Sequence, residues 1–170
     1  MLVIVKIVVI LLIGIVASLL VVAFGSLKNT SGSSSTYDKM SFRETMDLCE
    51  LPIVTFTNNG IKLNFLLDTG CSTSVIHKEV LGNLDYTDSN MVGEIYGMEG
   101  NKQSTFYINM NISYKDKDYE ESFQVVDMSA PFGHLKAEHG VNLHGILSSS
   151  FFEKYKYVLN YDELVAYSKA

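Results

Sequence analysis

The sequence predicts an all-β domain that follows an apolar N-terminal segment. From about Leu48 onward, short stretches alternate between apolar and polar residues, which is typical of strands with one buried face. Turn signals separate these stretches, most clearly Asn58-Asn59-Gly60 and the charged run at 115–118. A chain of 170 residues is long enough for one such domain plus additional segments.

Composition and charge argue against nucleic acid as a partner. The net charge is −6, and no cluster of basic residues interleaved with aromatic residues occurs. A nucleic-acid-binding protein needs such a basic surface, so we expect no nucleic-acid partner. Cys49 and Cys71 are too few for a disulfide-based fold, and the sequence leaves open whether they pair.

Residues 1–25 are predicted to anchor the chain in membrane lipid. Residues 2–24 are almost entirely apolar, and no charge interrupts the run after Lys6. About 20 helical residues cross the hydrocarbon core, and in lipid a helix satisfies all of its own backbone groups. The alternative is a signal peptide cleaved at Ala23-Phe24-Gly25. We expect a single-pass protein of the cell membrane with an extracytoplasmic domain, although basic residues flank both ends of the segment.

A linker and a folded domain are predicted to follow the anchor. The linker, residues 26–47, contains the Gly/Ser/Thr tract at 30–36, whose composition is typical of a flexible connection. The folded domain is assigned to residues 48–170. Its first strand is Leu51–Phe56, where Pro52 lies near the start and a missing backbone donor is tolerated.

Three further segments are predicted in the first half of the domain. Ile61–Leu67 returns from the Asn-Gly turn as a second strand. Val75–Leu81 continues as a short strand and a helical turn. Residues 91–108 contain three glycines between two β-rich arms, a pattern that favours a mobile hairpin.

The second half of the domain begins with another predicted hairpin, formed by Phe106–Ser113 and Tyr119–Val126. Pro131–Asn142 is predicted to be a loop. Three histidines in or just after this loop are spaced five residues apart: His134, His139 and His144. This spacing fits no known zinc pattern, so no metal site is predicted.

The end of the chain is predicted to form a strand, a short helix and a closing strand. Leu143–Leu147 is the buried strand, and the serines at 148–150 are expected to cap the helix that follows. The closing strand is expected to run from Tyr157 to Tyr167.

The strand Ile61–Leu67 leads directly into Asp68-Thr69-Gly70. Placing a carboxylate at the rim of an apolar core costs solvation free energy. An aspartate at this position is therefore a candidate functional residue. Gly70 permits a tight turn behind the carboxylate, and the Thr69 hydroxyl can hold that turn by hydrogen bonding. The alternative interpretation is an ordinary aspartate between a strand and a turn.

This stretch resembles the active-site loop of retropepsin-like (retroviral-type) aspartic proteases. The resemblance rests on Asp68-Thr69-Gly70 with apolar pairs on both sides, Leu66-Leu67 and Val75-Ile76, and it extends over about Leu51–Tyr167. It implies a single-lobe, closed β-barrel of the acid-protease type with one or two short helices. It also implies that Asp68 is catalytic and that no cofactor takes part.

The same resemblance assigns further residues by position. The active-site loop continues with Thr69, Gly70, Cys71 and Ser72. The flap that covers substrate is assigned to Tyr96, Gly97, Met98, Glu99 and Gly100. Two positions depart from the family pattern: Cys71 stands where Ala is usual, and Ser148 stands where Gly is usual. For Cys71 we expect inert packing, with oxidation as the alternative, and Ser148 leaves the local backbone geometry open.

Hydrolysis by this chemistry requires two carboxylates side by side that share one proton. The chain holds one usable motif, because Asp88-Ser89-Asn90 and Asp127-Met128-Ser129 both lack the glycine. The hypothesis is therefore a membrane-anchored, homodimeric aspartic endopeptidase acting on polypeptides, with Asp68 of both chains at the two-fold axis. The alternatives are a catalytically silent peptide-binding or dimerisation module and a tethered interaction protein that only resembles a protease.

Overall fold

The computed structural model describes residues 38–96 and 102–168. The predicted membrane anchor at 1–25 and the predicted flap residues 97–100 lie outside this part of the chain. Within it, none of the helices combines the length and the apolar composition that crossing a membrane requires. The anchor therefore remains a prediction from sequence.

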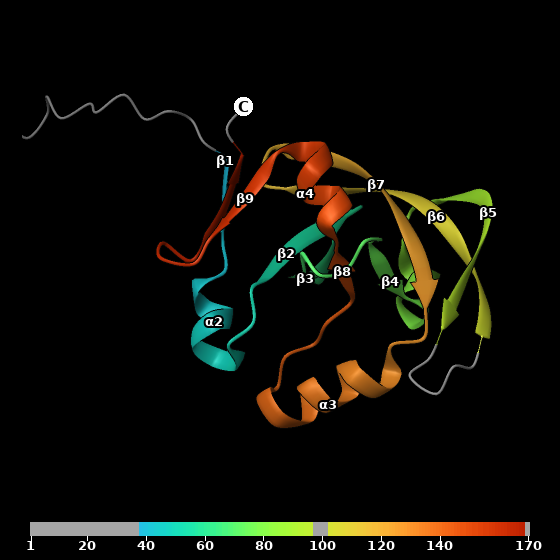
Figure 1. Ribbon diagram of the computed structural model, residues 1–170, viewed down its shortest axis with the longest axis horizontal. Helices are drawn as coiled ribbons and strands as arrows, with labels where there is room; N and C mark the ends of the chain where they lie inside the picture. The colour runs from blue at the N-terminus through green and yellow to red at the C-terminus, as the bar shows by residue number, and fades with distance from the viewer. Residues whose placement is uncertain (1–37, 97–101, 169–170) are drawn as a thin grey trace, which may run out of the picture. The chain divides into compact units, whose positions relative to one another are not determined.

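The described residues form an all-β domain with a few short helices (Figure 1). The strands are β1 (Asp38–Ser41), β2 (Ile53–Asn58), β3 (Ile61–Leu67), β4 (Val75–His77), β5 (Thr87–Tyr96), β6 (Lys102–Tyr114), β7 (Lys117–Val126), β8 (Gly145–Leu147), β9 (Tyr157–Asn160) and β10 (Val165–Ser168). The helices are α2 (Arg43–Cys49), α3 (Ser129–His139), α4 (Ser149–Tyr155) and the 3-10 helix η1 (Lys78–Asn83). Three α-helices thus occur among the described residues where one or two were expected.

Six strands close into a barrel in the order β2-β3-β8-β4-β7-β6, and β6 pairs back to β2. The barrel closes where Thr57 lies opposite Ser113. There the Thr57 hydroxyl donates to the Ser113 carbonyl over 3.4 Å. The remaining strand of this sheet, β5, pairs only with β6 and forms the outer arm of a hairpin. The predicted closed β-barrel is confirmed.

The β2–β3 hairpin follows directly from its sequence. Asn59 and Gly60 both have positive φ, at 47° and 83°, as a two-residue turn of the favoured hand requires. The turn fixes the register, so that Ile53 lies opposite Leu66 and Asn58 opposite Ile61. Alternate residues of both strands then face the barrel core, and the strand ends at Leu67 directly before Asp68.

The topology around β8 determines where the active-site loop lies. β8 pairs in parallel with β3 and antiparallel with β4, so it fills the space between these two strands. The chain that joins β3 to β4, residues 68–74, must therefore pass over the end of β8. Figure 1 shows that β8 leads from α3 towards α4, so this loop lies near the start of α4.

The folded part begins earlier than the boundary predicted from sequence. Residues 38–47, assigned to the linker, form β1 and most of α2. β1 pairs with β10, which pairs with β9, in a separate three-stranded sheet. Met40 and Phe42 are fully buried and join the main core. These two apolar residues stand among polar ones, so the local composition resembles that of a linker.

Asp38 ties β1 to the barrel through a buried polar cluster. Its carboxylate accepts hydrogen bonds from Tyr157 at 2.6 Å and Tyr119 at 2.8 Å, and the Lys117 ammonium lies 3.2 Å away. Partial burial alone would raise the pKa of Asp38, but these three partners stabilise the carboxylate and hold its pKa below the usual value.

Replacing Asp38 with Ala should lower the free energy of unfolding by about 1–3 kcal/mol at neutral pH, because charge-assisted hydrogen bonds are lost. Since folding lowers the Asp38 pKa, the stabilisation is complete above the unfolded-state pKa of about 4 and is lost as pH falls through the folded-state value. Urea unfolding followed by tyrosine fluorescence measures both effects. The exposed residue Glu153 provides the control, and Glu153→Ala should change stability by less than about 0.5 kcal/mol. A deficit for Asp38→Ala that is equal at neutral and strongly acidic pH would contradict this account.

The predicted loop at Pro131–Asn142 is wrong, because most of it belongs to α3. Pro131 lies in the first turn, where its missing N–H has no helical acceptor to lose. Gly140 ends the helix with a positive φ of 70°. The helical pattern is faint in the sequence because Pro131 and Gly133 lie inside it and few of its residues are apolar. In this helix His134 lies 3.3 Å from Glu138, four residues on.

The predicted strand Tyr157–Tyr167 is also corrected, because the structure divides it into β9 and β10. A four-residue turn joins them, and Leu164 in this turn has a positive φ of 54°. The turn contains neither glycine nor proline, the residues that most clearly signal a turn. β9 and β10 then pair antiparallel, with Ala166 opposite Leu159.

Candidate active site

Asp68 lies directly after β3, at the point where the barrel wall gives way to the loop. Its N–H donates to the Leu147 carbonyl at 2.9 Å, so the β3–β8 pairing extends one residue beyond the strand. The Asp68 side chain is half-buried. The barrel wall therefore holds the backbone of this residue while its carboxylate remains accessible.

The Asp68-Thr69-Gly70 sequence forms a turn closed by its own side chain. The Gly70 N–H donates to Asp68 Oδ1 at 2.8 Å. A Cβ atom at position 70 would lie 3.2 Å from the same oxygen. Glycine therefore allows the backbone to approach the carboxylate closely, which fixes the orientation of the carboxylate.

The start of α4 holds the middle of the loop. The N–H and the hydroxyl of Ser149 both donate to the Cys71 carbonyl, each at 2.9 Å. The Cys71 thiol is half-buried and lies 3.0 Å from the Thr73 carbonyl, so it packs within the loop. Thr69 and Ser72 are exposed. The structure thus brings the four predicted loop residues, Thr69 to Ser72, together around Asp68.

The two acidic stretches that lack the glycine lie outside this loop. Asp127 pairs with Lys78 at 2.6 Å beyond the end of β7. The Lys78 ammonium and the Ser129 hydroxyl and N–H hold the pKa of Asp127 well below its usual value. Asp88 lies on β5, where its carboxylate accepts from the Asn90 N–H at 2.9 Å. The described chain supplies one loop of this kind.

The face that carries Asp68 is apolar next to the loop. Side chains alternate along a strand, so Leu66 points to the same side as Asp68 and away from the barrel core. Leu66 pairs with Ile146 of β8. Both are half-buried in a second apolar cluster, to which α3 contributes Phe132 and Leu135. α3 therefore forms part of an apolar wall beside the loop.

Ser148, the departure from the family pattern, has an unstrained backbone. Its φ of −91° and ψ of 177° are extended, a region that any residue adopts. Ser148 lies at the N-cap of α4 as expected, but its side chain makes no capping hydrogen bond to the helix. The expected serine cap is therefore wrong in its contacts, because the hydroxyl lies within hydrogen-bond distance of the Ser74 and Ser150 hydroxyls instead.

The predicted flap is only partly described. The β5–β6 hairpin confirms two arms in the predicted place, and Tyr96 ends the first of them. Gly97, Met98, Glu99 and Gly100 lie outside the described residues. Their assignment to a substrate cover therefore rests on sequence resemblance.

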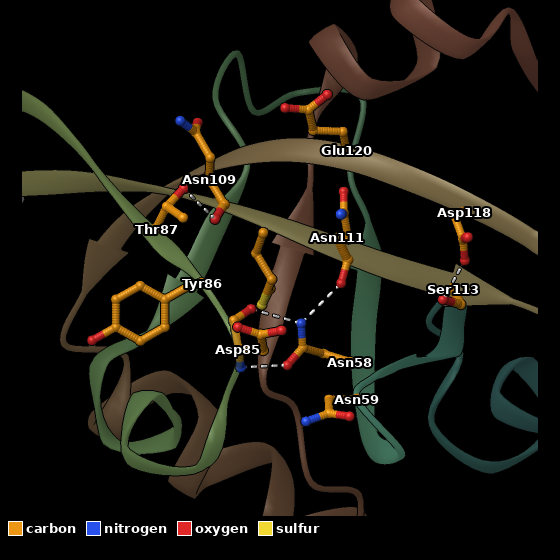
Figure 2. A pocket seen from close by; sticks show the side chains of 11 residues that line it. Asn58, Asn59, Asp85, Tyr86, Thr87, Asn109, Asn111, Ser113, Asp118 and Glu120 are labelled. Carbon is orange, nitrogen blue, oxygen red and sulfur yellow. Dashed lines mark hydrogen bonds between the residues drawn. The ribbon is translucent and has the colours of Figure 1, made fainter.

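A polar cavity of about 480 Å³ lies at the opposite end of β3 (Figure 2). Asn58 borders it and lies opposite Ile61, the first residue of β3, whereas Asp68 follows the last. The Asn58 amide donates to the carbonyls of Asp85 and Asn111, each at 2.9 Å, and accepts from the Asp85 N–H at 2.7 Å. Asn58 therefore connects the strands, and the cavity is separate from the Asp68 loop.

Sequence reasoning missed a buried polar group behind the loop. Glu121 of β7 lies 2.8 Å from the hydroxyl of Ser74, the last residue of the loop. The signal in the sequence was a carboxylate at an inward position, between Tyr119 and Phe123. Its contact with Ser74 spans 47 residues, so local patterns could not reveal it.

No protein-family model matches the chain. The retroviral protease-like domain of Ddi1 from Leishmania major superposes with a TM-score of 0.50 and 14% identity, over 66% of this chain and 82% of that one. The fold is retropepsin-like. EIAV protease, solved in complex with the inhibitor HBY-793, is also similar, with a TM-score of 0.45 and 22% identity over 64% of this chain and 90% of that one.

The retropepsin-like fold accounts for the closed barrel and for the position of Asp68 directly after β3. At these identities the comparison concerns the fold alone.

Proposed function

We propose that this chain is an aspartic endopeptidase that hydrolyses peptide bonds as a homodimer. The observation that carries the proposal is the Asp68 loop itself. A half-buried carboxylate follows a core strand, its Oδ1 is held by the Gly70 N–H at 2.8 Å, and its backbone is held by Leu147 at 2.9 Å. A rigidly oriented, accessible carboxylate on a retropepsin-like fold suits acid–base chemistry.

In the proposed mechanism, two Asp68 carboxylates lie about 3 Å apart and share one proton, because both cannot ionise easily at that distance. The ionised member removes a proton from a water molecule, which attacks the scissile carbonyl carbon. The protonated member gives its proton to the carbonyl oxygen, which produces a tetrahedral diol. The first carboxyl group then passes the proton it took from water to the amine nitrogen, while the second takes a proton back from the diol as the carbon–nitrogen bond breaks. The apparent pKa values belong to the pair rather than to either residue.

The proposal requires two chains because one chain supplies one such loop. In a symmetric dimer the two loops meet at the two-fold axis, and the Thr69 side chains, exposed in the single chain, are assigned to contacts across it. The predicted anchor at residues 1–25 would confine both copies to one membrane and raise their effective concentration. We place the domain on the extracytoplasmic side.

The proposed substrate is an extended polypeptide with a bulky apolar side chain near the scissile bond. The apolar wall formed by Leu66, Ile146 and α3 supports this choice, because it lies on the Asp68 side of the sheet. The flap assigned to residues 96–100 by sequence resemblance would cover the substrate. In the proposed mechanism, neither the attack of water on the carbonyl carbon nor the departure of the amine requires a metal ion or a cofactor.

The test is digestion of an unfolded protein by the full-length chain in detergent, over about pH 4–7. We expect internal cleavage with an acidic optimum, because one member of the acid pair must stay protonated. A peptide analogue with a secondary hydroxyl in place of the scissile carbonyl should inhibit it. In ¹⁸O-labelled water, single-turnover cleavage should place one labelled oxygen in each new carboxyl group, since water attacks directly.

Sedimentation of the same sample determines whether the chain is dimeric under the assay conditions. If the chain is dimeric and still leaves the substrate intact over the whole pH range, the peptidase proposal is rejected. That outcome would instead support a silent peptide-binding or dimerisation module.

A further inference from the structure

Glu121 is a buried carboxyl group that the proposed reaction does not use. Its residue is 5% exposed, and it points inward from β7 opposite Met110 of β6. Burying a carboxyl group is unfavourable unless hydrogen bonds compensate. Burial raises the pKa of Glu121 above its usual value, while the Ser74 hydroxyl and the Lys154 charge oppose the shift. The unfavourable burial of the Glu121 carboxyl group therefore indicates that this side chain has a specific role.

The hydrogen bonds of Glu121 lead to the active-site loop. Glu121 Oε1 accepts from the Ser74 hydroxyl at 2.8 Å. The Ser74 oxygen in turn accepts from the Ser148 N–H at 3.2 Å and lies 3.1 Å from the Ser148 hydroxyl. Ser148 Oγ lies 2.7 Å from Ser150 Oγ. Ser74 and Ser148 are both essentially fully buried, at 1% and 0% exposure.

These contacts link Ser74, at the end of the loop, to Ser148 at the junction between β8 and α4. Ser74 is the exit of the loop, and its carbonyl accepts from the Gln124 N–H on β7 at 2.8 Å. Ser148 stands between Leu147, which holds the Asp68 backbone, and Ser149, which holds the Cys71 carbonyl. Any displacement of Ser148 would therefore move both anchors of the loop together.

We propose that Glu121 is a positioning residue for Asp68, acting through Ser74 and Ser148 to fix the active-site loop against the β8–α4 junction. The kinetic part of this inference rests on the proposed peptidase function. The structural part concerns the rigidity of the loop and stands independently of that function.

The neutral form of Glu121 suits this role. Two of the neighbours of this carboxyl group are uncharged: Met110 lies opposite Glu121 on β6, and the Ser74 hydroxyl donates to Oε1. α4 presents Lys154, whose ammonium lies 3.9 Å from Oε2 and whose side chain is 51% exposed. Ionised Glu121 is thus weakly compensated, and the loop should loosen as pH rises through its pKa.

Hydrogen exchange tests the structural part in the full-length chain. In Glu121→Ala, the Ser148 amide should exchange at least about tenfold faster than in the wild type, while the β2–β3 amides stay unchanged. Glu121→Gln should behave like the wild type, because its amide oxygen still accepts from Ser74. Glu120→Ala is the matched control, since this neighbouring side chain is exposed and its change should alter neither set of amides.

Kinetics test the link to Asp68. Glu121→Ala should lower kcat about tenfold with KM within about twofold, because the loop and not substrate binding is affected. Glu121→Gln should keep kcat and retain activity to higher pH than the wild type, since the amide cannot ionise. Glu120→Ala should leave kcat and the pH profile unchanged.

If Glu121→Ala fails to fold, Ser74→Ala provides a second test. In this variant too, the Ser148 amide should exchange its hydrogen faster than in the wild type. Faster exchange throughout the barrel in either variant, or unchanged exchange at Ser148, would overturn the proposal. Identical pH profiles for the wild type and Glu121→Gln would also overturn it. If the wild type cleaves nothing, the peptidase proposal fails while the exchange results still decide the role of Glu121.

Discussion

Asp68→Asn should lower kcat for peptide cleavage by at least about a thousandfold, the largest effect we expect from any single change. That loss corresponds to about 4 kcal/mol of transition-state stabilisation. An amide can neither take the proton from water nor share one with its mate. The fold should persist, because the amide oxygen of the substituted side chain can still accept from the Gly70 N–H that now bonds Asp68 at 2.8 Å.

Asp88→Asn is the matched control for this loss. Asp88 closes a comparable turn, since its carboxylate accepts from the Asn90 N–H at 2.9 Å, but it lies on β5 away from the loop. Its replacement should leave kcat unchanged. Asparagine can still close both turns, so equal losses in the two variants would show that the effect is not specific to Asp68 and would contradict its catalytic role.

Mixing wild-type and Asp68→Asn chains tests the shared site directly. If each active centre takes one carboxylate from each of two copies, only dimers with two intact chains cleave. Activity should then fall with the square of the wild-type fraction, leaving about one quarter in an equal, fully exchanged mixture. A linear fall to one half would show that each chain works alone, and the dimeric acid pair would have to be abandoned.

The parts of this structure that sequence predicted are those set by local patterns. The β2–β3 hairpin combines strict alternation with an Asn-Gly turn, and Asp68-Thr69-Gly70 carries its own turn chemistry. Both are therefore visible in a few consecutive residues. The expectation that Asp68 ends a buried strand is confirmed for the same reason.

The parts that sequence missed depend on distant contacts or on weak local signals. β1 gains its structure from β10, more than 120 residues away, and Met40 is buried only by that contact and the barrel. α3 carries a proline and a glycine and few apolar residues, so its helical pattern is faint. Glu121 contacts Ser74 across 47 residues of sequence, so no local pattern indicates this hydrogen bond.

Gly145→Ala should destabilise the domain by about 3 kcal/mol, the largest stability loss we expect from adding a single methyl group. A Cβ atom at position 145 would lie 2.4 Å from the Val75 carbonyl oxygen and 2.6 Å from the Phe65 ring. Real Cβ atoms do not approach backbone so closely, so a strand would have to move. β8 cannot move freely, because Gly145 pairs with Phe65 on one side and Ile76 on the other.

Thermal unfolding of the full-length chain measures this loss, and a decrease in Tm of about 10 °C is expected for a domain of this size. Gly133→Ala is the matched control: it lies inside α3 with nothing within 4 Å of the added Cβ atom. Alanine there should raise stability by about 0.5–1 kcal/mol, since it favours the helix. The strand displaced in Gly145→Ala also carries Leu147, whose carbonyl holds the Asp68 backbone. Any folded Gly145→Ala protein should therefore lose catalytic rate as well as stability, and a variant as stable and active as the wild type would show that β8 does not fix the loop.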